Sequence, residues 1–478
     1  TTTTTSPRPR EIDELPSPRG VPVIGNLLQI RPESMHRTLE QWARELGPVY
    51  RFRVGRSRAV VIGDHEAFGA ALRDRPEGFR RPPQSAELVR EMGFQVGVFS
   101  ANGESWKRQR RLVMAGFDPR HLKAYFPSLV KVARRLDGRW RQAARENRAI
   151  DLQADLMRFT VDAIAGLAFG ADVNTLESEA DVIQRHIDQI FPILWKRLLS
   201  PVPVWRYLKR EADRRLDESV VEVKRAIDQF IAQARERLAA DPLRREHPVN
   251  LLEAMIVAAD QADSGVTDDD VRGNVLTLLL AGEDTTANTL AWTLDLLWRH
   301  PTTLQRAVEQ ARRLVPSPDS LSLEVLGELD YLEACAHEAM RLKPVAPMLA
   351  LDCLRETVVA GVRIVPGTRM FGILRHDGTD ARYFEDPEAF RPERWLVDGG
   401  PGQMAASSKR VSMPFGAGPR VCPGRHLALL EMKLALATLL SGFDITELDC
   451  GQPGATPECL AFTMAPVGLK MRLREHNL

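Results

Sequence analysis

Cys422 lies in the segment 415–424, which reads Phe-Gly-Ala-Gly-Pro-Arg-Val-Cys-Pro-Gly. The glycines and the proline before the cysteine predict a tight turn, and Gly424 permits close approach of the backbone. A run of good helix formers follows at 426–440, so the cysteine precedes a helix N-terminus, where N–H groups and the helix dipole favour a thiolate. A thiolate on a tight loop suits the axial position of a haem iron in oxygen activation, because the anionic sulfur favours O–O cleavage.

A glycine-rich turn with a cysteine buried in the core is the simpler alternative, since free cysteine is among the most buried residue types. However, the spacing F-G-x-G-x-R-x-C-x-G resembles the haem-binding signature of the cytochrome P450 family at every fixed position. The resemblance implies a haem b cofactor (iron protoporphyrin IX) with Cys422 as the iron ligand. It also implies that Phe415, Gly416, Arg420 and Gly424 belong to the haem-binding loop, with Arg420 directed at a haem propionate.

A long helix is predicted to start at Thr267, which can cap it, and to end at Pro301. Its middle, residues 281–286, reads Ala-Gly-Glu-Asp-Thr-Thr, and glycine and paired threonines are poor helix formers. Threonine hydroxyls in a helix can bond to the carbonyl one turn earlier and open the helix groove. Helix stability therefore does not explain these residues.

The resemblance implies that this patch widens to hold dioxygen above the iron, with Ala281 among the haem-contacting residues. Asp284 and Thr285 would be the acid–alcohol pair. Thr285 would hydrogen-bond the oxygen, and Asp284 would relay the protons that O–O cleavage requires. The alternatives are a hydrogen bond of Thr285 within its own helix and a role for Asp284 as a solvated helix acid.

Glu338 and Arg341 are three positions apart and share one face of a predicted helix. An isolated pair of this kind is most often an exposed ion pair of little energetic value. The sequence Phe-Arg-Pro-Glu-Arg-Trp at 390–395 resembles the family segment whose arginine, here Arg394, joins the pair in a buried triad. We assign the triad to the architecture of the haem pocket and not to chemistry.

Trp106 and Arg110 lie four positions apart, on one face of another predicted helix. The resemblance implies that both contact a haem propionate, since a guanidinium fork suits a carboxylate. The alternative is an ordinary basic amphipathic helix.

The substrate pocket is expected, by resemblance, near the 94–99 loop, the long helix, the 345–351 segment and the last strands, beneath a helix–loop–helix lid at 191–205. Its residues are mostly apolar, which favours an apolar substrate, although core packing is the alternative for each of them. They are Phe94, Val96, Val98, Leu278, Ala281, Val345, Met348, Leu349 and Phe462. Met348 or Leu349 stands where several relatives carry an arginine that reaches a propionate.

The composition sets limits on the class of protein. The chain has 478 residues, 44% of them hydrophobic, and 65 Lys+Arg against 64 Asp+Glu, so nothing favours a nucleic-acid partner. Its five cysteines have no metal-binding spacing and suggest a reducing compartment. No apolar run reaches the ~18 residues of a membrane span. A cytoplasmic protein without a membrane span is expected.

The expected fold is mostly α with small β-sheets, the cytochrome P450 fold, with the long central helix over the haem. A flexible Pro/Arg-rich arm is predicted at 1–30, with disorder over its first 20 residues, and a single haem domain at 31–478. The predicted strands are a hairpin of 49–54 with 59–62, a second strand–turn–strand of 357–362 with 369–374 around 365–367, and short strands at 460–474.

The function that follows is that of a haem-thiolate monooxygenase, which inserts one oxygen atom from O2 into an apolar small molecule. The chain shows no second cysteine cluster and ends soon after the last strands, so electrons are expected from a separate ferredoxin or flavodoxin and its NAD(P)H reductase. Basic residues are expected to attract that partner on the thiolate side: Lys107, Arg108, Arg111, Lys409, Arg410 and Arg425. A peroxide-driven peroxygenase and a haem carrier or gas sensor are the alternatives, and the Asp284–Thr285 pair disfavours both.

Overall fold

The computed structural model describes residues 8–117, 119–178, 183–200, 202–396 and 403–476. The chain forms two compact units, each built from separate stretches of sequence. Unit 1 comprises Thr1–Pro83, Ala346–Ala389 and Ala406–Cys422, and unit 2 comprises Gln84–Val345, Phe390–Ala405 and Pro423–Leu478. The predicted mostly-α fold with small sheets is confirmed.

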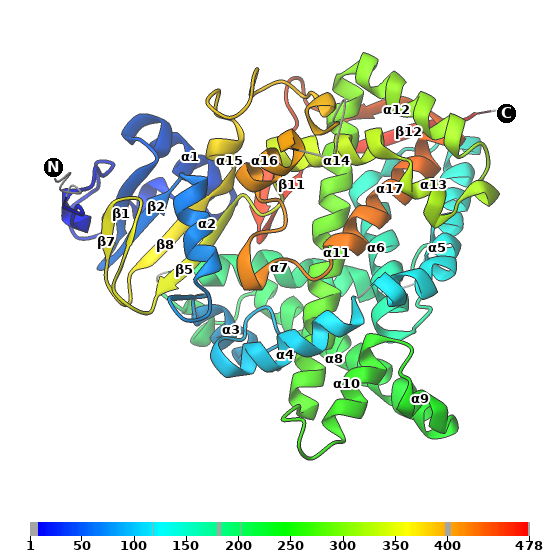
Figure 1. The fold of residues 1–478 in the computed structure, drawn as a ribbon, viewed down its shortest axis with the longest axis horizontal. Helices are drawn as coiled ribbons and strands as arrows, with labels where there is room; N and C mark the ends of the chain where they lie inside the picture. The colour runs from blue at the N-terminus through cyan, green and yellow to red at the C-terminus, as the bar shows by residue number, and fades with distance from the viewer. Residues whose placement is uncertain (1–7, 118, 179–182, 201, 397–402, 477–478) are drawn as a thin grey trace, which may run out of the picture. The chain divides into compact units, whose positions relative to one another are not determined.

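A five-stranded sheet with the order β1-β2-β8-β5-β3 organises unit 1 (Figure 1). Strands β2 and β8 are parallel, and the other neighbours are antiparallel. The strands are β1 (Val49–Val54), β2 (Ser57–Ile62), β3 (Phe79–Arg80), β5 (Met348–Cys353) and β8 (Arg369–Ile373), and the helices are α1 (Met35–Leu46), α2 (His65–Arg73) and α15 (Leu374–Gly378). The β1–β2 pair confirms the first predicted hairpin.

The second predicted hairpin is wrong. Strand β6 (Thr357–Val359) pairs with β7 (Val362–Ile364), and the turn between them is Ala360-Gly361, not the segment 365–367. Both turn residues have positive φ, 51° and 71°, as in the two-residue turns whose twist matches that of paired strands. Strand β8 follows the 365–367 segment and joins the larger sheet instead.

The N-terminal arm makes defined contacts with unit 1. Leu15 is buried, the Arg51 N–H donates to the Pro16 carbonyl, and Arg10 forms a bridge with Val362. The expectation of disorder therefore does not hold for residues 8–20, and residues 1–7 lie outside the described residues. Two short 3-10 helices lie within the arm, η1 (Ile12–Glu14) and η2 (Leu27–Gln29), and a third, η3 (Pro32–Ser34), follows it.

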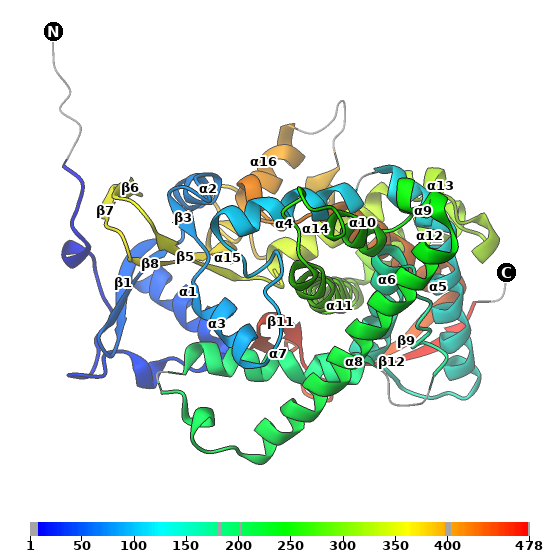
Figure 2. The ribbon, with the colours of Figure 1, turned by 90° about the horizontal axis from the view of Figure 1, so that it is seen from below.

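Unit 2 is built from helices around the long helix α11 (Asp268–Arg299). Figure 1 shows α11 lengthwise with α6 and α17 beside it, and Figure 2 looks nearly along its axis. The other helices are α3 (Gln84–Glu91), α4 (Gly103–Gly116), α5 (Pro119–Arg145), α6 (Leu152–Phe169), α7 (Ile183–Leu199), α8 (Glu211–Ala240), α9 (Pro242–Glu246), α10 (Leu251–Ala259), α12 (Pro301–Leu314), α13 (Leu323–Gly327), α14 (Asp330–Leu342) and α17 (Arg425–Gly442).

Two small sheets complete unit 2. The first has the order β4-β12-β9, with β4 (Ile150–Asp151), β9 (Phe443–Asp449) and β12 (Lys470–Glu475). The second is the hairpin of β10 (Glu458–Ala461) and β11 (Thr463–Pro466), and together these strands confirm the short strands predicted near the end of the chain.

Helix α11 begins and ends as predicted. The Thr267 side chain accepts from the Asp270 N–H and the Asp270 side chain bonds back, which forms a capping box, and the next helix starts at Pro301. A Cβ atom on Gly282 would lie 2.8 Å from the Ile164 side chain of α6, so glycine at this position leaves room for that side chain. No helix of the described residues has the length and apolarity of a membrane span.

Candidate functional site

The Cys422 loop follows α16 (Gln403–Ser412) and has the tight turn that its sequence predicts. Gly416 and Gly418 have φ of 73° and 71°, and the Cys422 N–H donates to the Phe415 carbonyl at 2.9 Å, which closes the loop. A Cβ atom on Gly418 would lie 2.5 Å from the Leu72 carbonyl oxygen, so the loop can pass α2 only with glycine there. Cys422 is half-buried, forms no disulfide and lies just before α17, the position that favours a thiolate.

The other buried cysteines have a different environment. Burial raises the pKa values of the Cys335 and Cys353 thiols, so both remain protonated at neutral pH. Neither suits a thiolate ligand.

Three arginines of unit 1 gather around the same loop. The Arg75 guanidinium donates to the carbonyls of Ala417 and Leu72, both at 2.9 Å. Burial, together with the positive charges of Arg420 and Arg75, holds the pKa of Arg81 well below its usual range. An anionic group would relieve this repulsion, and guanidinium forks suit carboxylates such as haem propionates. The cluster therefore fits the implied cofactor, and Arg81 is a residue that no sequence motif indicated.

One turn of α11 is open in an otherwise buried stretch. Between Gly273 and Leu297, all of which the structure describes, Ala281 is the one exposed residue, and Thr285, one turn later, is half-buried. A small side chain at an opening in a buried helix leaves room for a flat apolar group, as the implied haem requires. The Thr285 hydroxyl donates to the Ala281 carbonyl at 2.8 Å, so the intrahelical bond considered as its alternative is present.

Asp284 points in another direction. Its Oδ1 accepts from Asn288 Nδ2 at 2.6 Å, and its Oδ2 accepts from the hydroxyl of Thr463 on β11. Burial raises the pKa of Asp284 to about 6, and the hydrogen bonds from Thr463 and Asn288 oppose that rise. The alternative of a solvated helix acid is therefore wrong. In the described contacts no hydrogen bond joins Asp284 to Thr285.

Two further buried acids lie near Asp284, and sequence reasoning missed both. Glu283 is fully buried, and neither of its carboxyl oxygens has a hydrogen-bond donor among the described residues. Burial and the negative charges of Asp188 and Asp284 raise the pKa of Glu283 far above its usual range. Burial raises the pKa of Asp188, on α7, to about 7. A protonated Glu283 can donate a hydrogen bond to Asp188. Two neighbouring carboxyl groups that share a proton in this way do not repel each other as two charged ones would.

Glu338, Arg341 and Arg394 come together in the interior of unit 2. Arg341 Nε and Nη2 donate to the two Glu338 oxygens at 2.8 and 2.6 Å, and Arg394 Nε donates at 2.8 Å. The Arg391 N–H and Trp395 Nε1 also donate to Glu338, at 3.0 and 2.8 Å. The Glu338 and Arg341 side chains are fully buried, so the alternative of an exposed pair is excluded.

Trp106 and Arg110 both lie on α4, the first buried and the second half-buried. Gln109 ties α4 to α11, because its Nε2 donates to Asp270 at 2.8 Å. Arg108 also forms an ion pair with Asp270, at 3.3 Å. Arg108 is therefore a packing residue of α4 and not a freely exposed cation, whereas the propionate role of Trp106 and Arg110 stays a prediction.

Apart from Ala281, which is exposed, the predicted pocket residues divide into two groups. Phe94, Val98 and Leu278 are members of the hydrophobic core of unit 2, as the packing alternative expected. Half-buried positions are occupied by Val96, Val345 and Phe462 in unit 2 and by Met348 and Leu349 in unit 1.

Phe462 is the centre of an aromatic cluster. Its ring lies 5.0 Å from that of Phe191 in a stacked arrangement, 5.6 Å from Phe99, and 6.5 Å from Trp195 edge-on. The cluster brings together the 94–99 loop, helix α7 and the tip of the β10–β11 hairpin. Sequence reasoning placed these segments at the pocket but named only Phe462 as a pocket residue.

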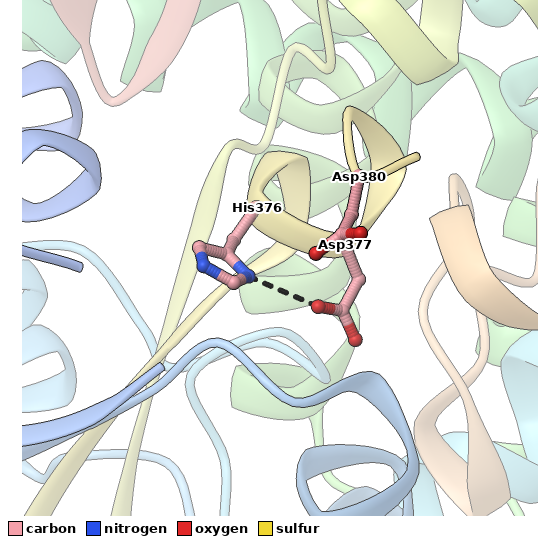
Figure 3. A group of neighbouring side chains, drawn as sticks. All are labelled: His376, Asp377 and Asp380. Carbon is pink, nitrogen blue, oxygen red and sulfur yellow. Dashed lines mark hydrogen bonds and ion pairs between the residues drawn. The ribbon is translucent and has the colours of Figure 1, made fainter. Parts of the chain in front are cut away.

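A separate group of His376, Asp377 and Asp380 in unit 1 has the residue types of a metal site (Figure 3). However, Asp377 already accepts from His65 Nδ1 at 2.7 Å, from the His65 N–H at 2.9 Å and from His376 Nδ1 at 3.0 Å. Although burial opposes it, these hydrogen bonds lower the pKa of Asp377. The group is a hydrogen-bonded link between α2 and α15, and we assign no metal to it.

Comparison with known proteins supports the same family. A family model described as Cytochrome P450 matches residues 15–473. A tryptamine 5-hydroxylase of Oryza sativa subsp. japonica is 29% identical over 92% of this chain and 85% of its own length. Cytochrome P450 71BT1 of Catharanthus roseus is 27% identical over 90% of this chain and 86% of its own length. A self-sufficient cytochrome P450 monooxygenase of Exserohilum turcicum, CYP505U2, is 27% identical over 98% of this chain but only 43% of its own length.

Replacing Glu338 by glutamine is expected to lower the free energy of unfolding by about 3–5 kcal/mol, because Arg341 and Arg394 lose their buried counter-charge. Urea unfolding measures the change. The matched control is Glu356→Gln, which removes the partner of the exposed Arg363 and should leave the unfolding midpoint unchanged. Equal effects of the two substitutions would contradict the importance of the buried network.

Glu283→Gln is expected to stabilise the protein at pH 8 by about 1–3 kcal/mol and to have little effect at pH 4. The folded state holds the Glu283 proton more tightly than the unfolded state does, so the wild-type protein loses stability as the pH rises above the ordinary glutamate pKa. Glutamine does not titrate, so the Glu283→Gln protein does not lose this stability as the pH rises.

Thermal unfolding of the wild-type protein and of Glu283→Gln between pH 4 and pH 8 measures the difference in stability. Glu104→Gln, at a side chain that is 85% exposed, is the control and should show no such pH dependence. An effect of Glu283→Gln that is the same at both pH values would refute the assignment of a raised pKa.

Proposed function

Since the chain belongs to the cytochrome P450 family and is a haem-thiolate monooxygenase, we propose that it binds haem b through Cys422 and oxidises an apolar small molecule with electrons from a separate protein. The observation that carries the proposal is the Cys422 loop. Its positive-φ glycines and its closing hydrogen bond place Cys422 just before a helix N-terminus.

The residues that would hold the haem follow from the site. Cys422 would supply the thiolate ligand of the iron, and the cluster of Arg75, Arg81 and Arg420 would neutralise propionate carboxylates. For Ala281, in unit 2, a haem contact stays a prediction, which its small side chain at the open turn of α11 supports. When bound, the haem supplies the activation of O2, from which one oxygen atom enters the substrate and the other is reduced to water.

Asp284 and Thr285 would manage protons. A carboxyl group whose pKa is raised to about 6 can both donate and accept a proton near neutral pH, which suits a relay. Thr285 lies at the open turn of α11, and its hydroxyl oxygen can accept a further hydrogen bond while it donates to Ala281. Asp284 is therefore the proton reservoir of this proposal, and Thr285 is the group nearest to the opening.

The aromatic cluster supports an apolar substrate. Phe99, Phe191, Trp195 and Phe462 bring three separate segments together, and apolar and aromatic walls are typical of pockets for apolar ligands. We propose that the substrate contacts the Phe462 side of this cluster.

A separate ferredoxin or flavodoxin, with its NAD(P)H reductase, is the proposed electron donor. Lys409 and Arg410 are exposed on the last turn of α16, close in sequence to the Cys422 loop, and would attract an acidic partner. Lys107 pairs with Glu104, so it contributes less to such a surface than the sequence suggested. We also propose a cytoplasmic location, on the basis of the sparse cysteines.

The first test is the optical spectrum of the dithionite-reduced protein with carbon monoxide. A strongly red-shifted Soret band is expected, because a thiolate donates electron density to the iron. Cys422→Ala should abolish the band, whereas the control Cys450→Ala, at a cysteine outside the loop, should retain it. A band at the position typical of histidine ligation, or a band that survives in Cys422→Ala, would refute the ligand assignment.

The second test concerns the electron donor. NADPH oxidation by the holoenzyme is expected only when a ferredoxin and its reductase are added, with a rate that falls as salt screens the charges. Lys409→Glu with Arg410→Glu should lower that rate by about tenfold at low salt. Oxidation with NADPH alone, or turnover with hydrogen peroxide but not with the donor system, would overturn the proposal.

A further inference from the structure

Strand β11 lies along one face of α11. Asp284, Asn288 and Trp292 are spaced by four residues, so they share that face, and each contacts the strand. Trp292 Nε1 donates to the Met464 carbonyl at 3.1 Å, and Asn288 Nδ2 lies 3.5 Å from the Thr463 hydroxyl. The β10–β11 hairpin is therefore held against the helix at a defined register.

Thr463 contacts the carboxyl group that the proposed function uses for protons. Its hydroxyl donates to Asp284 Oδ2, while Asn288 donates to Oδ1. Thr463 is 6% exposed and Asp284 9%, so solvent has little access to either partner. A carboxylate with one donor on each oxygen has a single preferred orientation, and one of these two donors comes from outside the helix.

The residue before Thr463 is the centre of the aromatic cluster. Phe462 lies at the tip of the hairpin, between the paired residues Ala461 and Thr463, with φ of 85°. This conformation is strained for a bulky side chain and persists only where the surroundings fix it. The rings of Phe191, Phe99 and Trp195 provide such surroundings.

We propose that Thr463 is a positioning residue for the monooxygenase reaction, which holds the Asp284 carboxyl group in one orientation and links that orientation to the aromatic cluster. A molecule that moves the Phe462 ring also moves the peptide that carries the Asp284 donor. Occupation of the apolar pocket and the supply of protons thus become coupled through one hairpin. The inference rests on the proposed proton role of Asp284.

Several charged and titratable groups face this site and affect its titration. The negative charge of Asp284 raises the pKa of Asp188 on α7 and of Glu283 on α11, and the negative charge of Asp188 also raises the pKa of Glu283. Arg158 on α6 acts on Asp188 as a positive one. All of these groups remain in place when Thr463 alone is changed.

The test compares Thr463→Val, which keeps the shape and removes the hydroxyl, with Thr463→Ser, which restores it. The control is Thr293→Val, because the Thr293 hydroxyl is equally buried but donates only within α11, to Thr289. Infrared difference spectra of each holoenzyme, titrated from pH 4 to 9, follow the carboxyl band that is lost in Asp284→Asn.

The titration midpoint of that band is expected to move to higher pH in Thr463→Val, because the ionised carboxylate loses a donor. It should return in Thr463→Ser and remain at the wild-type value in Thr293→Val. An unchanged midpoint in Thr463→Val would overturn the positioning role, and so would an equal shift in Thr293→Val.

Turnover provides the second measurement, with NADPH, a ferredoxin, its reductase and naphthalene as the apolar probe. The share of NADPH electrons released as hydrogen peroxide should rise by about threefold or more in Thr463→Val and recover in Thr463→Ser. An unchanged peroxide share in Thr463→Val would overturn the link to the reaction. Failure of the wild-type protein to be reduced would count against the proposed electron donor alone, since the infrared titration decides the role of Thr463 without turnover.

Discussion

The burial of α11 is the constraint on which the rest of unit 2 depends. From Gly273 to Leu297 the helix has one exposed residue, so each polar side chain on it needs a hydrogen-bond partner, either within the helix or from a neighbouring element. Asn274 donates a hydrogen bond to Gln109 of α4, and Asp295 accepts one from Thr456. These partners fix the positions of the surrounding helices and strands around α11.

The same requirement shapes the candidate site. Asp284 obtains one partner from its own helix and one from β11, which holds the β10–β11 hairpin with its aromatic tip against α11. Glu283 is the exception, since neither of its oxygens has a described donor. Its raised pKa keeps the carboxyl group protonated, and a neutral group is less costly to bury than a charged one. A helix whose surroundings are fixed along most of its length gives the open turn a rigid frame, as proton transfer over short distances requires.

Sequence reasoning succeeded where the signal is local. The Cys422 turn, the caps of α11 and the β1–β2 hairpin depend on neighbouring residue types, and all three have the predicted form. The second hairpin failed because two possible turns lie within a few residues, and positive φ at Ala360-Gly361 decided between them.

The partners of the site residues could not be predicted from local sequence. Arg81, beside Arg75 and Arg420 in unit 1, and Asp188 and Thr463, which interact with α11 in unit 2, carry no motif, and each reaches its partners only because distant segments of its own unit meet in the fold. The Glu338 network was accessible from sequence through the family resemblance, whereas its donor Trp395 became visible only in the structure.

The acid and the alcohol of the site are adjacent in sequence, yet they face different surroundings. Successive residues of an α-helix point about 100° apart, because 3.6 residues complete a turn. Asp284 can therefore be buried against β11 while Thr285 lies at the open turn, on the same rigid backbone. The helical twist itself places a protected carboxyl group with a raised pKa one residue from an accessible hydroxyl. A proton source that is shielded from bulk solvent and still close to the opening needs such a change of direction, and two adjacent helix positions provide it.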